Sequence, residues 1–547
     1  LDAPIVEGNV SIAPFNPRPL MRKLAIELAP GRKQTLRKVS LSSKIKADLN
    51  GQSLAFSGLV LTLDTLSLKG EVQVNKFLDA PRLSGQLEMP SFAPAAVIDL
   101  LHIDVQPRYR DALAKGAVKA RFSADWASQT LEVTRLSAKF DRLVLSARVR
   151  VSKFMTAPRY KGVVQVAAFD LRRLLNKSGF SYDVADKRVL RRVKFASNFK
   201  GSPDGMVFSE INATVDSSVI TGMIEIKNFT HPAYRIDLDV GEVDLDRYVA
   251  SGRRRAAVPK VVSGRQPQPL QIPLGIVRDL DLQAHARFAR LKVFGLHSSD
   301  VSVRLAAKAG LMTIGPNRAT LYGGRYQGNT TIDVRRKVPK ITIREGLTHI
   351  QLGPFLKDAN MYKKFSGTGD ITVNLTARGY DTGAILRTLN GKGVIVVRNG
   401  KVEGVNLQKS INRARVQYEM LRGRPVSVVP DASDETVFTH LASTITLSNG
   451  VAQNNDLRMQ GRNLRATGKG AASLPKETIN YRLNVTVAEA ASSRGITVPV
   501  DIRGTFSQPT YSVAWNEVLQ AQVQRSIQKK FEDSLRKKLK DKFKLKF

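Results

Sequence analysis

Residues Lys76–Arg82 read Lys-Phe-Leu-Asp-Ala-Pro-Arg, and 77 positions later Lys153–Arg159 read Lys-Phe-Met-Thr-Ala-Pro-Arg. A looser third copy contains Phe229 and Pro232. Self-similarity at a fixed spacing is the signature of an array in which each unit buries its apolar face against its neighbours. The sequence therefore predicts tandem units of about 77 residues across residues 1–250.

Within each unit, apolar residues alternate with polar ones, for example Val72 and Val74 with Glu71 and Gln73. Side chains of a strand point alternately to opposite faces, so this alternation predicts antiparallel strands with one apolar and one wet face. We expect a mainly β fold, an elongated repetitive sheet curled into a groove. The repeated apolar positions expected to line that groove are Leu66, Leu68, Val72, Val74, Leu143, Leu145, Val149, Val151, Ile224 and Ile226.

Periodicity cannot distinguish a groove lining from a packed core, because a second layer would cover the same positions. Both interpretations stay open at each of these residues.

Short helices are expected where one unit passes into the next. Asn16-Pro17 and Phe169-Asp170 place a capping residue before an apolar helical turn. Asp64, Asp141 and Asp216 mark the same point in successive units, and we interpret them as residues that cap a turn through their own side chains.

Downstream of the repeats, residues 251–273 form a basic, proline-rich linker, and residues 274–515 form a second β region. Residues 516–547 predict a basic amphipathic helix with an apolar residue at every fourth position. Such a helix suits an anionic membrane surface, and a capping helix docked over the last strands is the alternative. The predicted membrane-contact residues are Lys529, Lys530, Phe531, Leu535, Lys537, Lys538, Leu539 and Phe543.

The composition limits the partners of this chain. The net charge of +39 calls for an anionic partner, such as a membrane surface or nucleic acid, or for a solvated basic face. No nucleic acid is expected, because charge alone indicates it and no aromatic-interleaved basic motif accompanies that charge. No run of eighteen apolar residues occurs, and the sequence starts at Leu1. We expect an N-terminal anchor in a segment that this chain lacks.

No catalytic or metal-ligating cluster emerges from the sequence. The six histidines are scattered, and there is no cysteine. Gly391-Lys-Gly393 and Gly468-Lys-Gly470 lack the continuation of a phosphate-binding loop, and we interpret their glycines as turn residues. We therefore expect a protein that is not an enzyme and has no cofactor.

Several segments of the second half resemble the AsmA family of bacterial envelope proteins, which is related to TamB-like and YhdP-like bridge-type lipid transport proteins. Their order and spacing fit the C-terminal region of that family. The segments are Thr320–Gly324, Leu389–Leu407, Thr436–Gly450, Leu464–Leu474 and Val498–Pro509.

The resemblance implies a periplasmic protein anchored in the inner membrane, whose partners are phospholipids and other envelope proteins. The expected function is phospholipid transport between the inner and outer membranes, by sliding acyl chains along an apolar β-groove, and so outer-membrane biogenesis. The alternative is a periplasmic scaffold that assists outer-membrane protein assembly, with a filled β core and no lipid cargo.

Overall fold

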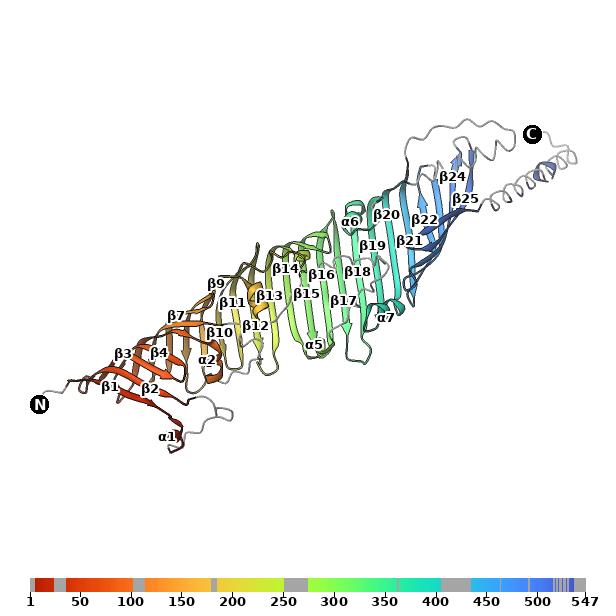
Figure 1. Ribbon diagram of the computed structural model, residues 1–547. Coiled ribbons are helices and arrows are strands. Elements are labelled where there is room, and N and C mark those ends of the chain that lie inside the picture. The colour runs from red at the N-terminus through yellow and green to blue at the C-terminus, as the bar shows by residue number, and fades with distance from the viewer. Residues whose placement is uncertain are drawn as a thin grey trace. The chain divides into compact units, whose positions relative to one another are not determined.

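A computed structural model of the chain describes residues 5–23, 36–101, 114–178, 184–249, 274–361, 364–404, 434–462, 464–489, 492–514, 517, 520, 524, 528 and 531–535. Its strands belong to one 26-stranded sheet, accompanied by a few short helices (Figure 1). The predicted mainly β class, with a long repetitive antiparallel sheet, is confirmed. The chain divides into unit 1, Leu1–Arg254 with Asp281–Leu291, and unit 2, Arg255–Leu280 with Lys292–Phe547.

Unit 1 contains thirteen complete strands, each paired antiparallel with the next, and the larger part of β14 (Asp281–Val293). The strands are β1 (Ile5–Phe15), β2 (Val39–Asp48), β3 (Ser53–Leu63), β4 (Leu66–Asn75), β5 (Arg82–Phe92), β6 (Gly116–Asp125), β7 (Thr130–Phe140), β8 (Leu143–Ser152), β9 (Arg159–Phe169), β10 (Val193–Ser202), β11 (Gly205–Val215), β12 (Ser218–Lys227) and β13 (Ala233–Asp244). Its helices are α1 (Arg18–Lys23), α2 (Pro94–Leu101), α4 (Leu171–Lys177) and η2 (Leu245–Arg247).

Unit 2 has longer strands, several of 12–14 residues. They are β15 (Leu296–Lys308), β16 (Leu311–Leu321), β17 (Gly324–Asp333), β18 (Lys340–Gln351), β19 (Phe365–Arg378), β20 (Asn390–Glu403), β21 (Glu435–Ser448), β22 (Val451–Gln460), β23 (Leu464–Ser473), β24 (Thr478–Glu489), β25 (Ser492–Thr505) and β26 (Pro509–Val513). Its helices are α5 (Leu274–Asp279), α6 (Leu352–Asp358) and α7 (Thr382–Arg387).

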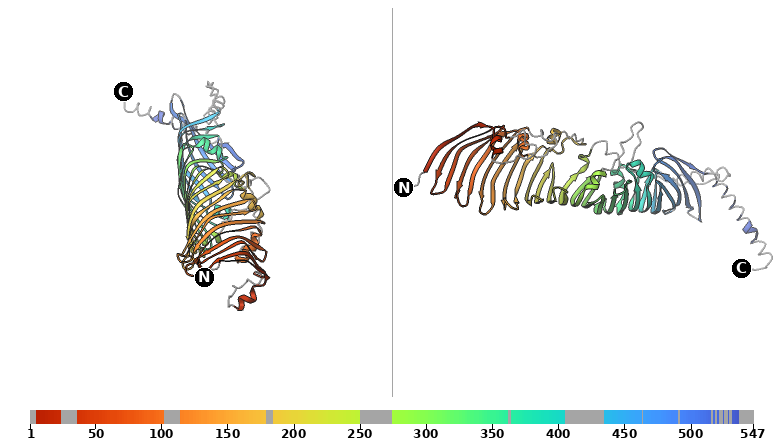
Figure 2. Two further views of the ribbon diagram at one scale, coloured as in Figure 1. Left: turned by 90° about the vertical axis from the view of Figure 1, so that its left-hand side faces the viewer. Right: turned by 90° about the horizontal axis from the view of Figure 1, so that it is seen from below.

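The two long edges of the sheet in unit 1 differ. Because the strands alternate in direction, the connections that contain α1, α2 and α4 all fall on one edge, which we call the helix edge (Figure 2, right). The other edge, which we call the tip edge, consists of short turns. These are residues 49–52, 76–81, 126–129, 153–158, 203–204 and 228–232.

The repeated aspartates lie on the helix edge and do more than cap their own turns. Asp64 adopts φ 54°. Its carboxylate accepts the backbone N–H groups of Leu36 at 2.6 Å, Arg37 at 2.7 Å and Lys38 at 2.9 Å, just before β2 begins. In the same way, the carboxylate of Asp216 accepts a hydrogen bond of 2.8 Å from the backbone N–H of Leu190, just before β10. Each aspartate therefore fixes the chain where it re-enters the sheet, which corrects the turn-capping interpretation.

The Gly-Lys-Gly segments are not turns. Gly391 and Gly393 lie within β20, and Gly468 and Gly470 lie within β23. A Cβ on Gly391 would approach the carbonyl oxygen of Asn374 on β19 to 2.1 Å. At Gly391, glycine therefore lets the backbones of two strands approach closely. All four glycines lie inside strands, so the turn interpretation was wrong.

Part of the sequence interpretation falls outside the described residues. This holds for the linker 251–273 and for Lys529, Lys530, Lys537, Lys538, Leu539 and Phe543. Residues 531–535 are helical, with Phe531 67% and Leu535 45% exposed. Among the described helices, none is both long and apolar enough to cross a membrane.

We predict that Asp64→Ala loosens the start of β2, since three backbone N–H groups lose their acceptor at a cost of about 1–3 kcal/mol. Hydrogen exchange of residues 36–48 should become faster, whereas Asp204→Ala, in an exposed turn of the tip edge, should leave it unchanged. Equal exchange in both variants would contradict the assigned role.

The same contact predicts a pH dependence. Burial raises the pKa of Asp64, but hydrogen bonds from the N–H groups of Lys38, Arg37 and Leu36 outweigh it, so the pKa is lowered overall. A lowered folded pKa stabilises the fold above the unfolded value of about 4 and loses that stabilisation as the pH falls through the folded value. Protection of residues 36–48 should therefore decline in that acidic range, and the decline should shrink in Asp64→Ala.

Candidate functional site

The apolar face of unit 1 is organised in rows that run from strand to strand. Residues opposite one another in successive pairs form one unbroken row across thirteen strands. Its members are Gly8, Ile45, Phe56, Val72, Gly85, Phe122, Val133, Val149, Gly162, Phe199, Phe208, Ile224 and Ile236. We call this the central row.

A second row runs beside it, nearer the tip edge, because residues two positions apart on a strand share a face. Its members from β3 onward are Leu54, Val74, Leu83, Ala124, Leu131, Val151, Tyr160, Gly201, Met206, Ile226 and Tyr234. A third row, nearer the helix edge, contains Met89, Val118, Ala138, Leu145, Val166, Phe195, Ala213, Ile220 and Val240. Together these rows form what we call the apolar track.

The sequence candidates fall on these rows in an ordered way. Val72, Val149 and Ile224 share the central row. The trio Val74, Val151 and Ile226 shares the second row, and Leu145 lies on the third. Leu66, Leu68 and Leu143 lie nearer the helix edge, opposite Leu63, Leu61 and Phe140. Each repeat adds four strands in one register, so equivalent residues return to the same row.

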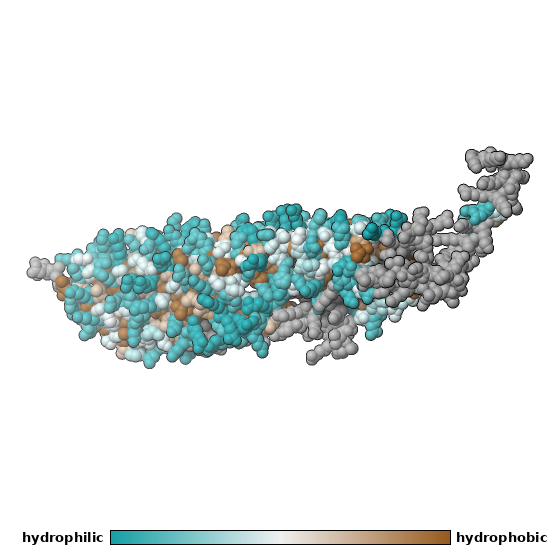
Figure 3. Space-filling model, turned by 90° about the horizontal axis from the view of Figure 1, so that it is seen from above, coloured by the Kyte–Doolittle hydropathy of each residue, from teal (hydrophilic) through white to brown (hydrophobic). Residues whose placement is uncertain are grey.

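The track residues are half-buried. All the candidates except Leu66, which is 6% exposed, have intermediate exposure. In the part of the chain that the structure describes, six hydrophobic residues of unit 1 are buried, against sixteen of unit 2. A sheet face covered by a second layer would bury its apolar rows completely. The described residues of unit 1 therefore leave this face uncovered. The molecule seen from above in Figure 3 shows scattered apolar patches among mostly polar side chains.

Glycine positions on the central row make space for aromatic rings. A Cβ on Gly162 would lie 2.8 Å from the ring of Phe199 on the adjacent strand. The Phe199 ring therefore occupies the space that a side chain at 162 would need. Phe122 lies opposite Gly85, where a Cβ would instead approach the backbone of β4, 2.2 Å from the carbonyl oxygen of Glu71. The row thus stays continuous although its side chains differ in size.

The apolar face of unit 2 is a packed core instead. Phe438 and Val397 are each 1% exposed, and Leu352 of α6 is 3% exposed. Phe365 packs against Phe438, with ring centroids 5.9 Å apart. The buried cluster consists of Leu321, Ile350, Leu352, Val397, Phe438, Met459, Leu464, Ala466, Val485 and Val498. Among the described residues, the apolar face of unit 2 is therefore filled by a packed core.

The opposite face of unit 1 is polar, with ion pairs between neighbouring strands. Lys119 lies 3.2 Å from Glu88, and Arg150 lies 3.0 Å from Glu132. These side chains are substantially exposed, so their pairing adds little to stability. The two faces of the described sheet of unit 1 thus differ, one being charged and the other apolar.

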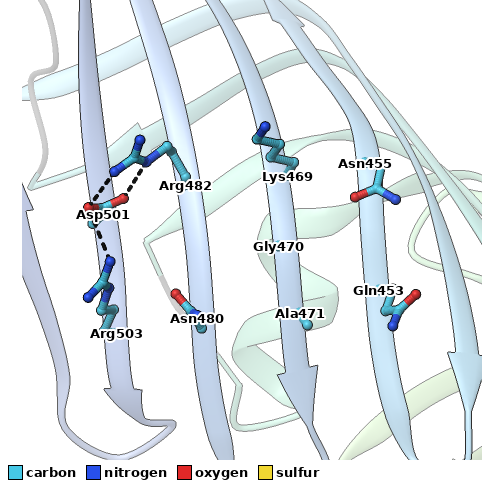
Figure 4. Close-up of a pocket in the computed structure, with 9 residues that line it drawn as sticks. All are labelled: Gln453, Asn455, Lys469, Gly470, Ala471, Asn480, Arg482, Asp501 and Arg503. Atoms are coloured by element: carbon cyan, nitrogen blue, oxygen red, sulfur yellow. Dashed lines mark hydrogen bonds and ion pairs between the residues drawn. The ribbon is translucent and has the colours of Figure 1, made fainter. Parts of the chain in front are cut away.

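A polar depression of about 580 Å³ lies on unit 2 (Figure 4). Arg482 makes a two-pronged pair with Asp501 at 2.6 and 2.9 Å and also reaches Glu517 at 3.2 Å. Hydrogen bonding from Arg482 lowers the pKa of Asp501. Arg503 contacts the carboxylate of Asp501 at 3.6 Å. Of the three cationic residues that line the depression, Arg482 and Arg503 are therefore paired with acidic groups, and Lys469 is the third. Apart from Gly470 and Ala471, the residues that line the depression are polar or charged.

In the described ranges, no three histidine, aspartate or glutamate side chains converge to hold a metal ion. The structure assigns no role to the scattered histidines beyond individual contacts, such as His297 with Asp358 at 3.3 Å.

The chain is similar in sequence to a known protein family. Residues 213–457 match the sequence model of the AsmA family. The chain is 22% identical over 374 residues to Protein AsmA of Escherichia coli (strain K12). That alignment covers 64% of this chain and 59% of the relative, so the chain spans less than two thirds of the relative's length. No solved structure matches the chain.

The contrast between the units predicts that a valine-to-alanine substitution lowers the free energy of unfolding by different amounts in the two units. Val397→Ala, in the core of unit 2, should cost about 2 kcal/mol because it opens a cavity. Val149→Ala, on the half-exposed track, should cost less than about 1 kcal/mol, since little area leaves a buried environment. Hydrogen exchange on peptides around each site measures both costs locally. Equal costs would mean that the track is covered like a core.

Proposed function

We propose, from the premise that this chain belongs to the AsmA family, that it moves phospholipids in the cell envelope and catalyses no reaction. Family membership points to an envelope function. The observation that carries the finer proposal is the apolar track, an uninterrupted apolar surface across thirteen strands with no second layer over it in the described part of unit 1.

Acyl chains suit the track because they are long, flexible and wholly apolar. Each methylene that they bury contributes about 0.8 kcal/mol. Twelve strand spacings give the track a length of roughly 58 Å, against the ~15 Å hydrocarbon thickness of one leaflet. Several lipids therefore fit along it at once.

A row of similar apolar side chains offers many positions of nearly equal affinity, so no single high-affinity site would hold a lipid in place. Transfer along the rows needs no catalytic residue, metal or cofactor. The polar head groups remain in water at the margins, while the tails follow the rows.

The expected location follows from the same proposal. A protein that moves phospholipids for outer-membrane biogenesis works in the periplasm, between the inner and outer membranes, and an N-terminal anchor would hold it at the inner membrane. The exposed apolar residues Phe531 and Leu535 suit contact between the basic C-terminal segment and an anionic membrane surface.

The packed core of unit 2 favours a second candidate, a scaffold for outer-membrane protein assembly that carries no lipid. A face filled by Phe438, Val397 and Leu352 has no room for acyl chains. If unit 1 carried nothing either, other envelope proteins would be the partners of the chain.

Lipid extraction tests the proposal directly. The protein purified in mild detergent should release several phospholipids per chain in mass spectrometry. The variant Val72→Asp, Val149→Asp, Ile224→Asp places three carboxylates on the central row and should lose most of this lipid, because a buried charge strongly opposes apolar contact. Circular dichroism and hydrogen exchange verify that the variant is folded.

A matched control has the same charge change on the same strands. Gln73→Asp, Ser146→Asp, Thr221→Asp alters exposed positions of β4, β8 and β12 on the polar face and should retain the lipid. Absence of lipid from the parent protein, or equal loss in both variants, would refute transport along the track and favour the scaffold.

A further inference from the structure

The repeated Lys-Phe-(Leu/Met) motif plays no part in the apolar track, and the structure places it on the tip edge. In both copies the lysine has a left-handed backbone, with φ 52° at Lys76 and 53° at Lys153. Ala80 N–H then bonds to the carbonyl of Lys76 at 3.1 Å, and Ala157 N–H to that of Lys153 at 3.0 Å. The motif therefore encodes one specific turn, used twice.

These turns present apolar side chains to solvent. Leu78 is 71% exposed and Met155 is 63% exposed, whereas the preceding phenylalanines are half-buried. Three other turns of the tip edge also carry a large exposed apolar residue: Leu49 at 52%, Trp126 at 42% and Phe229 at 49%. Five of the six turns on this edge thus share the feature.

Neighbouring turns are tied to one another. Gln52 donates to Asp79 at 2.9 Å, and Trp126 N–H donates to the carbonyl of Pro81 at 3.1 Å. Thr156 donates to Gln129 at 3.2 Å. The rings of Trp126 and Phe154 meet edge to face, with centroids 5.3 Å apart. The tip edge is therefore a pre-formed ridge rather than a set of independent loops.

The spacing of the tips argues against a protein partner. They recur every second strand, roughly 10 Å apart, and stand singly among polar residues. A stable protein interface needs a contiguous buried patch near 800 Å² per partner. A second copy of this chain would also bring another charge of +39 to the ridge.

A lipid surface accepts single apolar side chains independently of one another. Lys76, Lys153 and Arg159 are exposed in or beside the turns. Of the carboxylates there, Asp125 pairs with Arg82, Asp79 accepts a hydrogen bond from the neutral Gln52, and Asp204 is exposed. Apolar tips, a tryptophan and flanking cations are the combination that binds at the interface of an anionic bilayer.

We infer that the tip edge of unit 1 is a membrane-docking ridge, which inserts Leu78, Trp126, Met155 and Phe229 among the head groups of an anionic phospholipid surface. This role is separate from carriage along the track. It also differs from the contact expected of the C-terminal segment, because it lies along the sheet itself.

Vesicle co-sedimentation of the full chain tests the ridge. The variant Leu78→Ser, Met155→Ser, Phe229→Ser should bind phosphatidylglycerol vesicles roughly tenfold or more weakly than the parent, since three inserted apolar side chains are lost. The matched control Leu20→Ser, Val144→Ser, Val219→Ser removes three exposed apolar residues from the helix edge and should bind like the parent.

Tryptophan fluorescence reports contact at the ridge itself. The chain has two tryptophans, so Trp515→Phe leaves Trp126 as the only emitter. Its emission should shift to the blue with phosphatidylglycerol vesicles and much less with phosphatidylcholine vesicles.

Three results would overturn the ridge. They are parent-like binding by the ridge variant, equal loss in the helix-edge control, and complete loss of binding in Phe531→Ser, Leu535→Ser with the ridge intact. The lipid content of the purified ridge variant keeps the two proposals apart. The lipid content of the ridge variant should equal that of the parent protein. If no variant contained lipid, this would contradict the proposed lipid transport but not the membrane-docking ridge.

Discussion

The alignment of residues along the central row is the constraint on which this structure depends, and it is kept although most of the strand pairs contain a β-bulge or another register shift. A slip of one residue in any pair would turn every downstream side chain to the opposite face. The central row nevertheless continues across thirteen strands with an apolar residue or glycine at each step. The repeat preserves this register, since Val72, Val149 and Ile224 occupy one row. The aspartates of the helix edge support it by fixing the backbone where each new group of strands begins.

Much of this organisation could be predicted from the sequence. Alternation at Val72 and Val74 indicated the strands and their apolar face, because side-chain direction in a strand follows directly from residue order. The partners of Asp64 could not be predicted, since Leu36 and Lys38 approach it only after the chain has passed through other elements. Gly391 was assigned to a turn because glycine has no side chain to indicate that another strand lies against it. The sequence also could not distinguish a groove lining from a packed core. Val149 and Val397 both lie within strands, and they differ in how far the rest of the described chain buries them.

The same architecture serves the two units differently. In unit 2, large side chains such as Phe438 and helix α6 fill the apolar face, so hydrophobic burial stabilises the fold there. In unit 1 the rows stay half-exposed, and the ties between strands and turns have a larger share in holding the sheet. Extended apolar surfaces that stay half-exposed, as the described residues of unit 1 leave this one, are typical of binding surfaces. We propose acyl chains as the ligand of the track and a bilayer surface as the partner of the tips of the turns.

Site-specific photocrosslinking tests the central claim most directly. A benzophenone side chain at Phe122 or Phe199 would stand on the central row, and one at Arg148 would stand on the polar face of β8. Irradiation in native membranes followed by mass spectrometry should attach phospholipid at positions 122 and 199 and not at 148. Crosslinks to protein alone at 122 and 199, or equal lipid labelling on both faces, would contradict an apolar track that carries lipid.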